Sequence, residues 1–149
     1  MGASSPDADY AGDIASTEAW AVLAAEEDAQ IVDVRSMAEW NFVGLPDLTA
    51  LGRRVLTVEW QSYPAMTVNP YFAAQASELL AEAGAGFETA VLLLCRSGVR
   101  SRAAAIAMTK AGFRRAYNIS DGFEGDLDSE YHRGLRGGWK ASALPWRQG

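Results

Sequence analysis

Runs of consecutive apolar residues alternate with amphipathic stretches along this chain. Residues 90–94 (AVLLL) are apolar at every position, which is typical of a strand buried on both faces of a parallel sheet. Three shorter runs, at 31–34, 55–58 and 116–119, are further strand candidates. Because strands that alternate with helices form parallel sheets, we expect an α/β fold. Its central parallel sheet should have four to five strands, with helices on both faces.

Capping residues and apolar spacing place helices between these strands. Ser16 or Thr17 can cap a first helix, and Ser36 can cap a short second one. Two longer helices are predicted, from about Tyr71 to Ala83 and from about Val99 to Lys110. The second of them begins directly after the strongest strand.

The length of the chain fits one domain. Its 149 residues, 49% of them hydrophobic, are enough to bury a substantial core. Residues 1–12, rich in Ala, Gly, Ser and Asp, are expected to form a flexible lead-in. Residues 13–149 are then a single domain, in which the tail beyond residue 121 carries no pattern that assigns it to an element.

The charge of the chain narrows the classes of partner. A net charge of -6 argues against binding to nucleic acid or to an anionic membrane, because both need a basic face. No apolar stretch approaches the roughly 18 residues of a membrane helix. The first residues also lack the basic segment and apolar run of a signal peptide. We therefore expect a cytoplasmic protein that binds neither nucleic acid nor membrane.

The chain contains one cysteine, Cys95, between the strongest strand and a predicted helix. Composition alone favours a small buried hydrophobe for a lone cysteine. Its position reverses that expectation, because ligands of open α/β sheets bind at the carboxyl edge of the strands. Loop amides and the positive end of a helix dipole favour a thiolate there, and Arg96 and Arg100 add positive charge if they turn inward. The pattern predicts a nucleophile that needs no general base.

The number of histidines distinguishes between two reactions that a cysteine nucleophile could carry out, hydrolysis and sulfur transfer. A hydrolase of the Cys–His type needs an imidazole to accept and return protons. The only histidine is His132, in a glycine-rich and charged tail, where a solvated surface position is expected. Sulfur transfer needs no proton shuttle on the nucleophile and is therefore favoured.

Three motifs, at residues 31–35 (IVDVR), 95–101 (CRSGVRS) and 116–119 (AYNI), resemble those of the rhodanese (thiosulfate sulfurtransferase) superfamily in its single-domain form. Residues 95–101 (CRSGVRS) resemble its active-site loop. Residues 31–35 (IVDVR), followed by 39–40 (EW), resemble its first strand and Asp-x-Arg signature. Residues 111–113 (AGF) and 116–119 (AYNI) resemble the segment that leads to its last strand. The motifs occur in the family's order and extend over nearly the whole chain.

This resemblance implies a reaction in two steps. Cys95 would take the outer sulfur of a small anionic donor such as thiosulfate, form a persulfide, and pass the sulfur to a thiol or cyanide acceptor. Proteins of a sulfur relay are a further partner class that the resemblance allows. Residues expected to bind the substrate are Arg96, Ser97, Gly98, Val99, Arg100 and Ser101. The two arginines would hold the anionic donor, and no cofactor or metal is implied.

Asp33 and Arg35 of the Asp-x-Arg signature are expected to support the structure rather than to react. Arg35 and Glu39 are four residues apart at the start of the short helix. Residues at this spacing can form an ion pair that fixes the helix.

Two alternatives to sulfur transfer stay open. Related phosphatases and arsenate reductases place an arginine after five intervening residues, whereas Arg100 follows Cys95 after four. They also usually carry histidine before the cysteine, where this chain has Leu94. The second alternative is a non-catalytic rhodanese-like module that binds or regulates a partner through the same cleft.

The chain also departs from the family pattern after its last strand. The usual glycine pair is replaced by Asp121 and Gly122. The aromatic residue expected shortly afterwards could be Phe123, Trp139 or Trp146. The two tryptophans would then either cover the active site or pack on the sheet.

Overall fold

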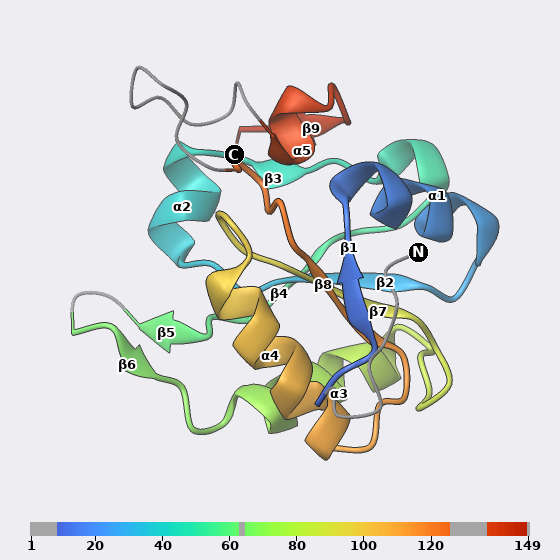
Figure 1. Cartoon of the computed structure of the whole chain (residues 1–149), viewed down its shortest axis with the longest axis vertical. Coiled ribbons are helices and arrows are strands. Elements are labelled where there is room, and N and C mark those ends of the chain that lie inside the picture. Colours follow the sequence, from blue (N-terminus) through green and yellow to red (C-terminus); the bar gives the residue numbers. More distant parts are fainter. Residues whose placement is uncertain (1–8, 63–64, 126–136, 149) are drawn as a thin grey trace.

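A five-stranded parallel sheet, in the order β1-β8-β7-β2-β4, forms the centre of the computed structural model (Figure 1). The structure describes residues 9–62, 65–125 and 137–148. The strands of the sheet are β1 (Gly12–Ile14), β2 (Gln30–Asp33), β4 (Leu56–Thr57), β7 (Val91–Leu94) and β8 (Ala116–Ile119). Every pairing in the sheet is parallel, as the alternation of strands and helices predicted.

Helices cover both faces of this sheet, which confirms the predicted α/β architecture. The helices are α1 (Ser16–Ala25), α2 (Met37–Phe42), α3 (Phe72–Glu82), α4 (Val99–Lys110) and α5 (Gly138–Ala141), with a 3-10 turn at Thr49–Leu51. One core packs α3 and α4 against the sheet, and includes Val91, Leu93 and Met108. The other packs α1 and α5 against the opposite face, and includes Leu92 and Leu94. Since side chains alternate between the faces of a strand, the continuous apolar run of β7 supplies both cores.

Two short antiparallel pairs lie outside the sheet. Strands β3 (Leu45–Pro46) and β9 (Trp146–Arg147) pair with each other and bring the end of the chain onto the segment after α2. Strands β5 (Gln61–Ser62) and β6 (Thr67–Val68) form an arm that projects beside α2 and α4 in Figure 1. The arm follows β4 and therefore emerges from the carboxyl edge of the sheet.

The four strands and the two longer helices that the sequence predicted have boundaries within two residues of the predicted ones, but the start of the domain differs. Residues 10–12 were expected in a flexible lead-in, whereas Gly12 pairs with Tyr117 in the sheet. The amide of Ala11 donates to the Ala116 carbonyl at 2.9 Å, and the Tyr10 hydroxyl donates to Asp13 at 2.9 Å. These residues form an edge of the sheet because β8 supplies the backbone partners that their own sequence does not indicate.

Candidate active site

Cys95 lies at the end of β7, the central strand of the sheet, and directly before α4. Its side chain is buried, with 1% of its surface exposed, at the base of a cleft of about 390 Å³. The cleft is lined by Glu39, Gln61, Met66, Cys95, Arg96, Ser97, Val99 and Arg100. The carboxyl edge of the sheet therefore carries a recess with the sulfur at its floor, as expected for an open α/β fold.

Two groups of its own loop contact the Cys95 sulfur. The Gly98 amide donates to Sγ at 3.1 Å, and the Ser101 hydroxyl oxygen lies 3.1 Å from Sγ. Gly98 has a φ of 101°, and a Cβ there would lie 2.4 Å from the Ser120 carbonyl oxygen. Glycine is therefore required both by the backbone turn and by the close approach of the loop to the end of β8.

A chain of hydrogen bonds continues from Ser101 into the sheet. Ser101 donates to Asn118 Oδ1 at 2.6 Å, and Asn118 Nδ2 donates to Asp13 Oδ1 at 3.0 Å. An ionised carboxylate only accepts hydrogen bonds, so Asp13 turns the amide nitrogen of Asn118 toward itself and the amide oxygen toward Ser101. The Ser101 hydroxyl thus lies between Asn118 and Cys95, and by rotation its single proton can serve either the Asn118 oxygen or the sulfur.

The turn after β8 holds the other side of the Cys95 loop. The Phe123 amide donates to the Cys95 carbonyl at 2.8 Å, and the amides of Glu124 and Gly125 donate to the Arg96 carbonyl at 3.0 and 3.1 Å. A Cβ on Gly122 would lie 2.3 Å from that carbonyl oxygen. The single glycine at position 122 thus takes the place of the expected glycine pair, because it lets the turn approach the loop backbone.

Arg100 enters the cleft but forms an ion pair with Glu39. Its two terminal nitrogens bind the two carboxylate oxygens at 2.7 and 3.0 Å. Burial opposes ionisation of Glu39, but the hydrogen bond and the charge of Arg100 outweigh it and lower the pKa of the carboxyl. Burial of Arg100 is likewise outweighed by Glu39, with a further contribution from Cys95, so the pKa of the guanidinium is raised. Arg100 is therefore near the sulfur and already paired.

The prediction of an ion pair between Arg35 and Glu39 is wrong. Arg35 precedes Ser36, which caps α2, so its side chain leaves the helix face on which Glu39 lies. It binds Asp33 instead, with Nη2 at 2.6 Å from Oδ2, and both side chains are fully buried.

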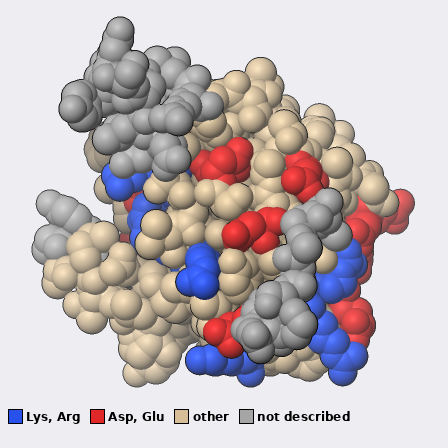
Figure 2. All heavy atoms as spheres, viewed as in Figure 1, with Lys and Arg blue, Asp and Glu red and all other residues tan. Residues whose placement is uncertain are grey.

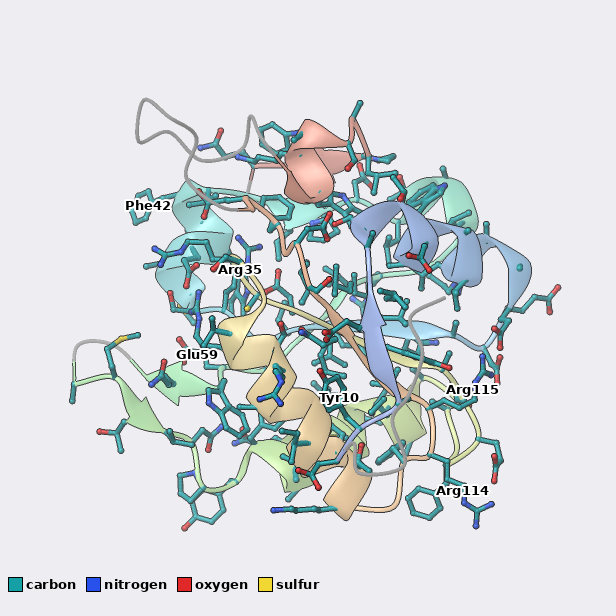
Figure 3. The ribbon with its side chains drawn as sticks, viewed as in Figure 1. Tyr10, Arg35, Phe42, Glu59, Arg114 and Arg115 are labelled. Carbon is teal, nitrogen blue, oxygen red and sulfur yellow. The ribbon has the colours of Figure 1, made fainter. Side chains whose placement is uncertain are left out.

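Arg35 has two further contacts, with Gly44 and with Phe123. Its Nη2 donates to the Gly44 carbonyl at 2.7 Å, and its guanidinium carbon lies 4.3 Å above the Phe123 ring. Figure 3 shows Arg35 between α2 and the start of α4. The pair thus joins the end of β2 to the turn that holds the Cys95 loop.

The remaining residues of the loop lie at its surface. Arg96 and Val99 are exposed and Ser97 is partly exposed, and all three line the cleft. Of residues 96–101, chosen from the sequence, two therefore contact the sulfur and the other four line the cleft. The sequence did not indicate Gln61 and Met66, which reach the cleft from the β5–β6 arm, nor the contribution of Asn118.

Of the three candidate aromatic residues, Phe123 and Trp139 are buried in the core against the sheet, whereas Trp146 is 42% exposed in β9. Trp139 is fully buried against Trp20, with ring centroids 5.9 Å apart, and its indole nitrogen donates to the Pro145 carbonyl. Phe123 is fully buried beneath Trp146, at a centroid distance of 6.3 Å. None of these residues lines the Cys95 cleft. His132 lies outside the described residues.

The described part of the chain contains no cluster of three or more His, Cys, Asp or Glu residues that could hold a metal ion. Among its helices, none has both the length and the apolar character needed to cross a bilayer. Acidic and basic side chains are interspersed on the face drawn in Figure 2, rather than segregated into a broad basic surface.

Comparisons with known proteins agree with this fold. The chain resembles the crystal structure of Rv0390 from M. tuberculosis, with a TM-score of 0.83, 49% identity, and coverage of 94% of this chain and 99% of that one. It also resembles the polysulfide-sulfur transferase homodimer of Wolinella succinogenes, with a TM-score of 0.57 over 94% and 80% of the two chains. At 21% identity the second likeness concerns the fold alone.

Sequence relatives extend the comparison. An uncharacterized protein of Rickettsia conorii is 36% identical over 90% of this chain and 95% of its own length. Rhodanese-like domain-containing protein 4 of Arabidopsis thaliana, a chloroplastic protein, is 27% identical over 86% of this chain and 24% of its own length. The family model of the STR4 middle domain matches residues 11–149. The chain belongs to this family, within the rhodanese-like superfamily.

Proposed function

We propose that the protein is a sulfurtransferase that carries sulfur as a persulfide on Cys95. The observation that carries this proposal is the position of the sulfur, at the floor of the cleft and in contact with the Gly98 amide and the Ser101 hydroxyl. Family membership supports it, because relatives and a structural neighbour bear rhodanese-like and sulfur-transferase names.

The reaction follows from the nucleophile and its surroundings. The Cys95 thiolate attacks the outer sulfur of an anionic donor such as thiosulfate, whose S–S bond breaks so that sulfite leaves with the bonding electron pair. The new S–S bond makes Cys95 a persulfide. A thiolate or cyanide acceptor then attacks the terminal sulfur, and Cys95 leaves as the thiolate. The Gly98 amide, already directed at Sγ, is placed to stabilise negative charge on the sulfur in both steps.

Chemistry at phosphate is less well supported by the same geometry. Arg100, the arginine nearest in spacing to the one that such enzymes use, is paired with a carboxylate, whereas a bound phosphate needs free cationic donors. A binding module without turnover is the other alternative, and the retained cysteine at the cleft floor favours catalysis over it. The cytoplasmic location expected from the sequence stays a prediction.

Mass spectrometry of the intact protein tests the proposal directly. After incubation with a sulfur donor and removal of excess donor, the protein should gain the mass of one sulfur atom. The gain should map to Cys95, disappear in Cys95→Ser, and be reversed by cyanide with release of thiocyanate. If no donor among thiosulfate, mercaptopyruvate and organic or protein persulfides produces this gain, the proposed function is wrong. A pulled-down partner that still binds Cys95→Ser would then favour the binding module.

A further inference from the structure

The ion pair inside the Cys95 cleft bears on the kind of sulfur donor that the protein can use. Arg100 and Glu39 both line the cleft, and their side chains are 18% and 20% exposed. Each terminal nitrogen of the guanidinium has its own carboxylate oxygen, at 2.7 and 3.0 Å. The fork that would bind a sulfonate oxygen pair is therefore occupied by the protein's own carboxylate.

The charge of the cleft follows from this pairing. The charged side chains that line it, within the described residues, are Arg96, Arg100 and Glu39. Arg100 and Glu39 neutralise each other, so the remaining positive charge of the cleft is that of Arg96, which is exposed. The pairing thus reduces the positive charge that the two arginines bring to the cleft from two to one. A dianion such as thiosulfate loses about twice as much attraction from this neutralisation as a monoanion at the same distance.

The mouth of the cleft is apolar on two sides. Val99 is 78% exposed at the start of α4, and Met66 is 42% exposed on the β5–β6 arm. Both line the cleft together with Cys95. Such a mouth can bury the carbon skeleton of an organic or peptide thiol, which gains free energy from burial of apolar surface, whereas a strongly hydrated inorganic anion gains nothing from it.

We propose that the donor is an organic persulfide of low charge, and that Glu39 determines this preference by engaging Arg100. The inference rests on the proposed function, in which Cys95 carries the sulfur. In the step itself, the Cys95 thiolate attacks the terminal sulfur of an R–S–S⁻ or R–S–SH donor. The donor S–S bond breaks, a new S–S bond forms on Cys95, and R–S⁻ leaves with the electron pair. The proton of R–S–SH, where present, stays on the terminal sulfur or passes to water.

The substitution Glu39→Gln removes the charge and keeps an oxygen where the carboxylate accepts from the Ser36 amide. Glu59→Gln is the matched control. The carboxylate of Glu59 accepts from the Met37 amide at 3.0 Å, also at the start of α2, but Glu59 does not line the Cys95 cleft. Figure 3 shows Glu59 below Arg35.

The rate constant for sulfur loading of Cys95 is measured by mass spectrometry with two donors, thiosulfate and 2-hydroxyethyl persulfide. The wild-type protein should load at least about tenfold faster with the persulfide. In Glu39→Gln the thiosulfate rate should rise about tenfold, because Arg100 becomes free to bind the dianion. The persulfide rate should rise no more than about threefold, because a monoanion gains about half as much interaction energy. Adding Arg100→Gln should abolish the gain, and Glu59→Gln should leave the donor ratio unchanged.

Several outcomes would overturn the inference. One is an unchanged thiosulfate rate in a folded Glu39→Gln protein, and another is wild-type loading that is as fast with thiosulfate as with the persulfide. Circular dichroism checks that Glu39→Gln is folded, and if it is not, the wild-type donor ratio decides alone. If the persulfide loads the wild-type protein but Glu39→Gln does not change the thiosulfate rate, the inference is wrong and the proposed function is still supported. If neither these two donors nor any other donor loads sulfur onto Cys95, both the proposed function and the inference about the donor are wrong.

Discussion

The hydroxyl oxygen of Ser101 lies 3.1 Å from the sulfur of Cys95 and 2.6 Å from Asn118 Oδ1, so that one hydroxyl contacts both groups. All three side chains are at least nine-tenths buried. Because Asp13 fixes the orientation of the Asn118 amide, the position of the Ser101 oxygen is determined by strands β1 and β8. The sulfur is therefore held from its own loop and, through Ser101, from the edge of the sheet.

Replacement of Ser101 by alanine should impair sulfur transfer more than folding. It removes the polar contact to Sγ and leaves Asn118 Oδ1 without its donor, which should cost about 1–3 kcal/mol of unfolding free energy. The rate of Cys95 loading should fall about tenfold or more, because a hydroxyl that can turn to donate to the negatively charged sulfur is lost. Ser101→Thr keeps the hydroxyl and should restore most of the rate.

Ser77→Ala, on the partly exposed surface of α3, is the control for removal of a serine hydroxyl. It should change neither the rate of Cys95 loading nor the urea midpoint. A loading rate in Ser101→Ala equal to that of wild type would contradict a role for Ser101 at the sulfur.

Gly122→Ala tests whether the turn after β8 positions the Cys95 loop. The new Cβ would lie 2.3 Å from the Arg96 carbonyl oxygen, at a φ of +65°, so either the turn or the loop has to shift. We expect a loss of about 3 kcal/mol, the sum of left-handed strain and overpacking, and a large fall in the rate of Cys95 loading.

Gly52→Ala separates the two causes of that loss. Gly52 has a φ of +69°, but no atom lies within 4 Å of the position that a Cβ would take there, so the same substitution adds backbone strain without a clash. It should cost only about 1–2 kcal/mol and leave the loading rate unchanged. Equal effects of the two variants, measured by urea unfolding and mass spectrometry, would show that the contact with Arg96 does not matter.

The local part of this structure could be predicted from the sequence. Ser36 caps α2 as expected, and β7 and α4 begin within one residue of their predicted starts, because capping and apolar runs act over neighbouring residues. Strand β1 could not be predicted. Gly12, Asp13 and Ile14 have no pattern of their own and become a strand only through β8.

The site shows the same division between local and long-range information. The Cys95 loop is contiguous in sequence, so its motif identifies it. The partners of the loop are not contiguous: Glu39 reaches Arg100 across 61 residues, and Asp13 reaches Asn118 across 105. The expected pair of Arg35 and Glu39 failed for this reason, since spacing along a helix says nothing about competing partners from other elements.

Arg35→Met should destabilise the fold strongly. It leaves the fully buried Asp33 carboxylate without its partner, and breaking a buried ion pair in this way costs about 3–5 kcal/mol. Arg114→Met breaks an exposed pair with Glu88 and should cost less than about 1 kcal/mol. Urea unfolding measures both, and equal losses would contradict the difference in burial as the cause.

A double variant distinguishes structural support from chemistry at Arg35. Asp33→Leu combined with Arg35→Met replaces both charges by apolar groups and should recover part of the lost stability. Cys95 loading should persist wherever the variant is folded. If a folded double variant no longer loads sulfur onto Cys95, the pair takes part in the reaction. The burial of the pair away from the cleft does not predict this result.

Acid should weaken the contribution of Glu39 to stability. The pKa of this carboxyl is lowered in the folded protein, since Arg100 outweighs the effect of burial, whereas the unfolded chain has the usual value near 4.5. A group whose pKa is depressed by folding stabilises the protein above its unfolded pKa, and loses that contribution as the pH falls through its folded pKa.

The difference in unfolding free energy between wild type and Glu39→Gln should therefore be constant above about pH 6 and shrink below about pH 4. Urea unfolding at fixed ionic strength across this pH range measures the difference. The other carboxyl groups are the same in both proteins, so their titration cancels in the difference. A difference that stays constant down to about pH 3 would mean that the ion pair with Arg100 does not stabilise the ionised form of Glu39.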